Sequence, residues 1–132
     1  MEERRIKTTL TVEESDRLID LGVDPKLASE IEYRPKKSGY GRLKYRVYSL
    51  ADILSILPKE IGHMRILTIN STNTLYFAFY AHWEKEYLSS YEEKVTHGIN
   101  DKAFSAPELI DALYQLLIWA IEQKYVKTNK DN

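Results

Sequence analysis

The longest regular pattern of apolar positions lies near the end of the chain, over residues 105–125. Apolar side chains recur there at steps of three and four residues, which is typical of one face of an α-helix. The apolar positions are Leu109, Leu113, Leu116, Leu117, Ala120 and Ile121. Ser105 with Glu108 three residues later predicts a capping box at the start, and Pro107 loses no hydrogen bond in the first turn. We expect this long helix to form the centre of the core.

Shorter helices are predicted earlier in the chain from their terminal residues. Thr11 with Glu14 predicts a capping box at the start of a first helix, and Gly22 predicts its end. The Asp-Pro pair at 24–25 predicts the N-terminus of a short second helix over 26–31. The first quarter of the chain is therefore expected to be helical.

After these helical segments, the sequence changes to the alternation of every second residue that is typical of a β-strand. Residues 33–48 alternate as a strand does, and a glycine-containing turn at 37–41 divides them, which predicts a β-hairpin. Directly after it, Ser49 with Asp52 predicts a capped third helix over 50–57. The hairpin is thus expected to lie between two helices in the sequence.

The clearest strand pattern covers residues 74–83, and residues 64–70 are expected to pair with it as a second hairpin. One set of alternate positions is expected to pack on the last helix, namely Leu75, Phe77, Phe79, Ala81 and Trp83. The opposite set is Thr74, Tyr76, Ala78, Tyr80 and His82. Residues 84–98 fit a third antiparallel strand, and a helix is the second choice for them.

Together these patterns predict an α+β fold, with a small antiparallel sheet packed against a long C-terminal helix and shorter helices around it. A chain of 132 residues is long enough for one hydrophobic core. We find no repeat or linker that would mark a second domain, so residues 1–132 are expected to form a single domain. Residues 1–8 and 127–132 are expected to be frayed.

The composition of the chain bears on its expected location in the cell. The chain has no cysteine, which excludes disulfides and thiolate metal sites. No window approaches the roughly 18 consecutive apolar residues of a membrane span, and the charged first residues do not resemble a secretion signal. The expected location is the cytoplasm, without a membrane partner. A formal net charge of -1 gives no global attraction to polyanions.

Candidate chemistry is sparse. The histidines His63, His82 and His97 are the only imidazole groups, and neither a third ligand nor a cysteine accompanies them in a metal-binding pattern. No serine lies in a Gly-x-Ser-x-Gly elbow, and no glycine-rich phosphate loop is present. We therefore expect no enzymatic activity, no catalytic residue, no cofactor and no metal.

The predicted hairpin carries the most informative local charge pattern. Residues 33–48 contain six cations and no acid, so the rest of the chain carries about -7 against the total of -1. Tyrosines are interleaved with these cations, a combination that can neutralise phosphates and stack on bases. The candidate nucleic-acid or anion-binding residues are Arg34, Lys36, Lys37, Tyr40, Arg42, Lys44, Tyr45 and Arg46. The alternative is that these cations protect an edge strand from aggregation or pair with acids elsewhere.

A second candidate surface is the polar row of the 74–83 strand. Tyr76, Tyr80 and His82 would mark a protein interface if they were exposed together. The alternative, which we favour, is that helices cover this row. The expected partner is an unidentified protein, nucleic acid is the alternative partner, and a monomer and a homodimer both remain open.

The order of these features resembles that of small uncharacterised proteins encoded by bacterial prophages and integrated mobile elements. The resemblance rests on the Thr-initiated helix with its Leu-Gly stop, the tyrosine-rich hairpin and the strand pair. Two sequence segments complete it, Ile56-Leu57-Pro58-Lys59-Glu60-Ile61 and Leu116-Leu117-Ile118-Trp119. It implies a mobile-element origin and assigns no residue a catalytic role. The leading expectation is a non-enzymatic interaction protein, and the alternative is nucleic-acid binding through the hairpin 33–48.

Overall fold

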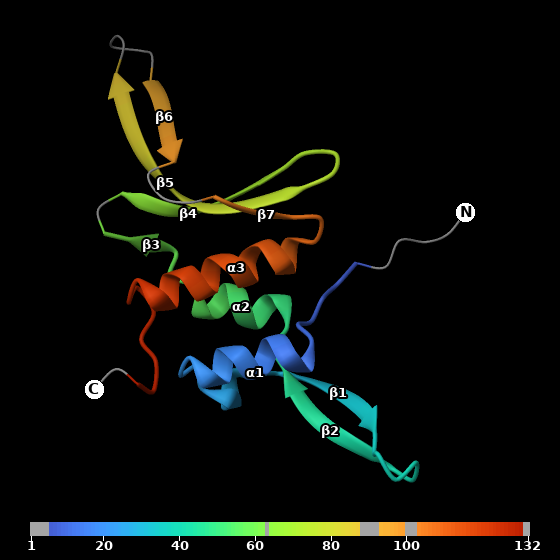
Figure 1. The fold of residues 1–132 in the computed structure, drawn as a ribbon. Helices are drawn as coiled ribbons and strands as arrows, with labels where there is room; N and C mark the ends of the chain where they lie inside the picture. The colour runs from blue at the N-terminus through green and yellow to red at the C-terminus, as the bar shows by residue number, and fades with distance from the viewer. Residues whose placement is uncertain (1–5, 63, 88–92, 100–102, 131–132) are drawn as a thin grey trace. The chain divides into compact units, whose positions relative to one another are not determined.

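The computed structural model describes residues 6–62, 64–87, 93–99 and 103–130 (Figure 1). Helices and antiparallel strands are both present, which confirms the α+β class. The chain divides into two compact units, residues 1–57 with 117–132 (the first unit) and residues 58–116 (the second unit). The expected single domain therefore stays a prediction, and each unit is described separately.

The first unit begins with helix α1 (Val12–Asp20), whose two ends are formed as predicted. Thr11 Oγ1 accepts a hydrogen bond from the Glu14 amide, and the Glu14 carboxylate accepts one from the Thr11 amide. At the other end Gly22 adopts a φ of 102°, and its amide donates to the Ile19 carbonyl. The Val23 amide donates to Leu18, which completes a Schellman motif around the left-handed glycine.

The predicted second helix over 26–31 is wrong beyond its first turn. Asp24 caps a single 3₁₀ turn, η1 (Pro25–Leu27), after which Ala28 is extended with a ψ of 112°. Strand β1 (Glu30–Pro35) follows directly and pairs with a later strand. Pairing along six residues satisfies more backbone groups than one further helical turn would, so the tertiary partner overrides the local helix signal.

The predicted hairpin and the helix after it are confirmed. Strand β2 (Arg42–Val47) pairs antiparallel with β1, from Glu30 opposite Val47 to Pro35 opposite Arg42. Helix α2 (Leu50–Ile56) then begins with a second capping box, in which Ser49 and Asp52 exchange hydrogen bonds. Figure 1 shows that the turn of this hairpin lies at the end farthest from α1.

The described parts of the two terminal segments differ from the frayed ends that we expected. The Thr8 carbonyl accepts a hydrogen bond from the Leu50 amide, and Thr9 forms a bridge with Ser49. Near the C-terminus the Asn129 amide donates to the Gly22 carbonyl at 2.7 Å. Backbone hydrogen bonds to other parts of the first unit therefore hold both segments.

The second unit contains a five-stranded sheet. Strand β5 (Tyr76–Tyr87) pairs on one side with β4 (Arg65–Ser71), which confirms the second predicted hairpin, and β3 (Glu60–Ile61) pairs with the start of β4. On its other side β5 pairs with β6 (Glu93–Ile99) and with β7 (Phe104–Ala106). The described residues of 84–98 are therefore strand, and the helical alternative is wrong there. They belong to two strands, and residues 88–92 lie outside the described chain.

Helix α3 (Leu109–Glu122) is the long C-terminal helix, but it begins later than predicted. Ser105 does not cap it, because Ser105 lies in β7 opposite Phe77. The Glu108 carbonyl accepts the Ala112 amide and so closes the first helical turn. The first half of α3 belongs to the second unit and packs on the sheet (Figure 1).

Candidate nucleic-acid interface

The register of β1 and β2 separates their side chains into two faces. We call the first the inner face, and its residues are Glu30, Glu32, Arg34, Leu43, Tyr45 and Val47. We call the second the cationic face, and its residues are Ile31, Tyr33, Pro35, Arg42, Lys44 and Arg46. Successive side chains of a strand point to opposite sides, so both acids of β1 lie on the inner face.

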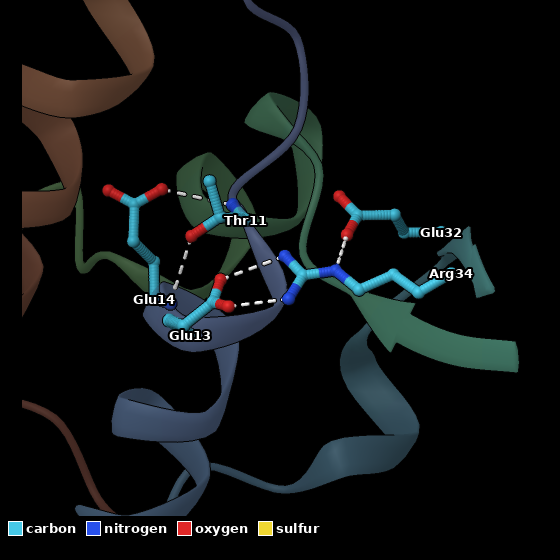
Figure 2. A network of polar contacts seen from close by, with 5 residues as sticks. All are labelled: Thr11, Glu13, Glu14, Glu32 and Arg34. Carbon is cyan, nitrogen blue, oxygen red and sulfur yellow. Dashed lines mark hydrogen bonds and ion pairs between the residues drawn. The ribbon is translucent and has the colours of Figure 1, made fainter. Parts of the chain in front are cut away.

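The inner face is held against α1 by an ion-pair network. Figure 2 shows the Arg34 guanidinium between Glu13 of α1 and Glu32 of β1. Its two terminal nitrogens lie 2.5 and 2.9 Å from the Glu13 carboxylate oxygens, and Nε lies 2.6 Å from Glu32. This bidentate geometry uses the planar fork of arginine and fixes the orientation of the side chain.

The same network sets the charge of its members. The hydrogen bonds from Arg34 lower the pKa of Glu13 from 4.5 to about 2, and Glu13 and Glu32 together raise the pKa of Arg34. Glu13 is thus ionised at neutral pH, and the arginine charge is balanced locally. Arg34 is therefore unsuited to bind a phosphate, although its sequence position suggested that role.

The cationic face has a different environment. Arg42, Lys44 and Arg46 are exposed and come from alternate positions of one strand. Within the described residues none of the three forms an ion pair with a carboxylate. Among the described residues, Arg34 is thus the one hairpin cation of the six that is paired with an acid.

Apolar and aromatic side chains from β1 lie beside this cationic row. Tyr33 is opposite Lys44, and 54% of its surface is exposed. The Arg42 guanidinium carbon lies 5.2 Å from the centroid of the Tyr33 ring, which is cation–π distance. Ile31 is opposite Arg46 and is 42% exposed. One exposed surface therefore combines three positive charges with an aromatic ring.

The turn of the hairpin adds further charge at its tip. Lys36 and Lys37 are exposed, and Tyr40 is 84% exposed. The Gly39 amide donates to the Lys36 carbonyl, and the Lys36 amide donates to the Gly41 carbonyl. Both glycines have φ near 80°, at 84° and 79°, which L-residues rarely adopt. The glycines thus let the chain reverse within a few residues and place both lysines at the end of the ribbon.

The structure does not bring all the predicted site residues together. Lys36, Lys37 and Tyr40 lie at the tip, and Arg42, Lys44 and Arg46 lie on the cationic face. Tyr45 lies with Arg34 on the inner face and is half-buried. Tyr33 was outside the predicted set. The sequence shows the alternation of each strand, but only the register shows which β1 residues share a face with the β2 cations.

The second predicted surface is not an exposed row. Tyr80 is fully buried, its hydroxyl donates to the Pro58 carbonyl at 2.6 Å, and burial raises its pKa. Tyr76 is 36% exposed, while His82 is half-buried in β5 between Arg65 of β4 and Gly98 of β6 in the register. Tyr80 is therefore a core residue, and the three side chains do not form an interface together.

Two polar residues that the sequence did not single out position the hairpin. Ser15 of α1 is completely buried, and its hydroxyl oxygen accepts a hydrogen bond of 3.2 Å from the Tyr48 amide. Tyr48 is also completely buried, and its hydroxyl donates to the Asp24 carbonyl. Burial, followed by the nearby charges of Asp24 and Asp52, raises the pKa of Tyr48 to about 12. Nothing in the spacing of Ser15 distinguishes it from an exposed helical serine.

Among the described residues, no group of three or more histidine, aspartate or glutamate side chains is placed to hold a metal ion. In that same part of the chain, no helix combines the length and the apolar content that a membrane crossing needs. Comparison with protein-family models, curated proteins and solved structures finds no match to this chain.

Proposed function

We propose that this protein binds nucleic acid through the cationic face and the tip of the β1–β2 hairpin. The observation that carries the proposal is the presence of five cations without a carboxylate partner within the described residues, beside exposed tyrosines. Arg34 is not part of this binding surface, because its ion pair with Glu13 anchors the hairpin to α1. The non-enzymatic role, the cytoplasmic location and the mobile-element origin are proposed with it, on the sequence alone.

Electrostatics supports this function despite the small net charge. A protein that neutralises phosphates releases condensed counterions, and this sequence-independent gain drives most non-specific binding. The gain depends on the local arrangement of cations, and here five of them lie within one hairpin of the chain. Separation of the β1 acids onto the inner face keeps them from competing for the cations of the other face.

The test compares two variants that have the same net charge. The first replaces Arg42, Lys44 and Arg46 by glutamate. The second is a control that replaces the exposed cations Arg17, Lys26 and Lys127 by glutamate. Fluorescence anisotropy with labelled oligonucleotides at low salt should show that the first variant loses at least about tenfold in affinity. The control should stay within a few-fold of the unmodified protein.

Both variants have a net charge six units more negative than that of the original chain, because each loses three cations and gains three carboxylates, so a general charge effect would weaken them equally. Equal weakening would overturn the assignment to the hairpin, and an absence of binding by the original chain at low salt would overturn the function itself. All three proteins should have the same melting temperature, because the replaced side chains are exposed.

A second candidate function is binding of a protein segment along strand β4. β3 pairs only with Arg65 and Ile66, so the edge of β4 from Thr68 to Ser71 has no strand partner within the described residues. Ile69 on this edge is 40% exposed, and an open apolar edge can accept an added strand. Concentration-dependent self-association that Ile69→Lys abolishes would support this role, and a monomer at all concentrations would argue against self-pairing.

A further inference from the structure

We infer that the ligand of the cationic face is a single strand of nucleic acid, with its phosphates over β2 and an unstacked base on Tyr33. This inference rests on the proposed function and adds the class of ligand. It comes from the unequal chemistry of the two strands, which the antiparallel register places side by side.

The cationic face consists of two parallel rows. All three side chains contributed by β2 are cations, and all three contributed by β1 are apolar or aromatic. Directly opposite side chains of an antiparallel pair have Cβ atoms about 5 Å apart. A single strand of nucleic acid has the same division along its length, with charged phosphates on one side and apolar base faces on the other. The two rows therefore match the two sides of one strand.

Tyr33 is the residue that favours a single strand over a duplex as the ligand. In a duplex each base is covered by its neighbours in the stack, and only base edges are accessible in the grooves. An exposed aromatic ring gains from the face of a base, which only an unpaired nucleotide offers. Tyr33 is half-exposed and lies in the middle of β1, next to Lys44 of the cationic row.

Arg42 extends the stacking surface of Tyr33. Its guanidinium group lies over the tyrosine ring, with 5.2 Å between the guanidinium carbon and the ring centroid. Both groups are planar, and arginine planes stack on bases as aromatic rings do. The pair thus presents an ordered platform before the ligand arrives, which reduces the entropy lost on binding.

The size of the face limits the length of the ligand that it contacts. Arg42 and Arg46 are four residues apart on a strand, which corresponds to about 13 Å. The face therefore contacts only a few nucleotides, and oligonucleotides of about ten residues should bind as well as longer ones at equal site concentration. The face contains no amide or carboxylate side chain to read base edges, and its three cations are assigned to phosphates, so we expect little sequence preference.

The experiment measures the affinity of the full chain for a short single-stranded oligonucleotide and for the duplex of the same sequence. The variants are Tyr33→Leu, Tyr33→Phe, Tyr40→Leu at the tip and, as a matched tyrosine control outside the hairpin, Tyr76→Leu. We expect the single strand to bind at least about tenfold more tightly, because stacking adds to the phosphate contacts. Tyr33→Leu should lose about tenfold on the single strand alone, and Tyr33→Phe should retain the affinity.

The outcomes separate the two proposals. The inference is overturned if the duplex binds as tightly as the single strand and Tyr33→Leu changes neither affinity. The proposed function would then stand, with the β1–β2 hairpin bound in a groove of the duplex. A loss with Tyr40→Leu but not with Tyr33→Leu would overturn the position of the base. Absence of salt-dependent binding to both ligands would overturn the inference and the proposed function together.

Discussion

Lys124 and Gly22 occupy the same position in two helix-ending motifs, yet only one of them is glycine. The Lys124 amide donates to Ile121 and the Tyr125 amide donates to Ala120, which repeats the Schellman pattern at the end of α1. Lys124 consequently adopts a φ of 65°, where its Cβ is strained. The sequence signalled the end of α1 through its glycine and gave no corresponding signal at Lys124.

Replacing Lys124 tests this strain. Lys124→Gly should be more stable than Lys124→Ala by about 0.5–1 kcal/mol, because only glycine adopts the left-handed conformation freely and both variants lose the same charge. Gly22→Ala should destabilise the protein, since its Cβ would lie 2.8 Å from Thr128 Cβ at a φ of 102°. Urea denaturation measures all three variants, and a Lys124→Ala variant as stable as Lys124→Gly would contradict the account.

Ser15 provides a second prediction at the residue scale. Ser15→Ala removes the acceptor of the buried Tyr48 amide and should lower the free energy of unfolding by about 1–3 kcal/mol. The control is Ser55→Ala, whose hydroxyl makes an exposed contact with the Asp52 carbonyl and whose loss should cost less than about 0.5 kcal/mol. Denaturant titration distinguishes them, and equal losses in the two variants would refute the role of Ser15.

At the scale of elements, Arg34 links the inner face of the hairpin to α1 through Glu13. The folded pKa of Glu13, about 2, lies below its ordinary value of 4.5. The pair thus contributes its full stabilisation above about pH 4.5 and loses it as the pH falls towards 2. Because Glu13 is exposed, solvent screening makes this contribution small.

The titration of Glu13 itself is the sharper measurement. An NMR pH titration of its carboxyl carbon should give a midpoint near 2 in the original chain, and Arg34→Met should raise that midpoint towards the ordinary 4.5, because the hydrogen bonds from Arg34 are the largest cause of the shift. Glu14 is the internal control. Partial burial alone would raise the pKa of Glu14, and hydrogen bonds from the Thr11 amide and Lys7 hold it below its ordinary value. If the titration midpoint of Glu13 were the same with and without Arg34→Met, the ion-pair network would be contradicted.

Elements whose signals are local could be predicted from the sequence. The capping boxes at Thr11 and Ser49 involve side chains three residues apart, and both are formed. Ser105 carries the same signal but lies in β7, because its backbone pairs with β5, nearly 30 residues earlier in the chain. Long-range pairing likewise replaced the helix expected over 26–31 and determined the register that forms the cationic face. A pattern within a few consecutive residues carries no information about such distant pairing partners.

At the scale of the whole molecule, charge is distributed unevenly. Residues 33–48 carry six cations within a chain of net charge -1, and the fold neutralises only Arg34 through acids of the described residues. The near-zero total therefore conceals a local cationic surface. This unevenness was visible in the sequence, whereas the pairing of Arg34 and the exposure of Tyr33 required the structure.

The most direct test of the central claim is the salt dependence of binding of a single-stranded oligonucleotide, followed by fluorescence anisotropy. If all five cations of the cationic face and the tip contact phosphates, the logarithm of the affinity should fall with the logarithm of salt concentration with a slope of about -3.5. Replacing Arg42, Lys44 and Arg46 by glutamate leaves Lys36 and Lys37 at the tip, so the slope should weaken to about -1.4 or less. Binding that does not change with salt, or no binding at low salt, would contradict the account.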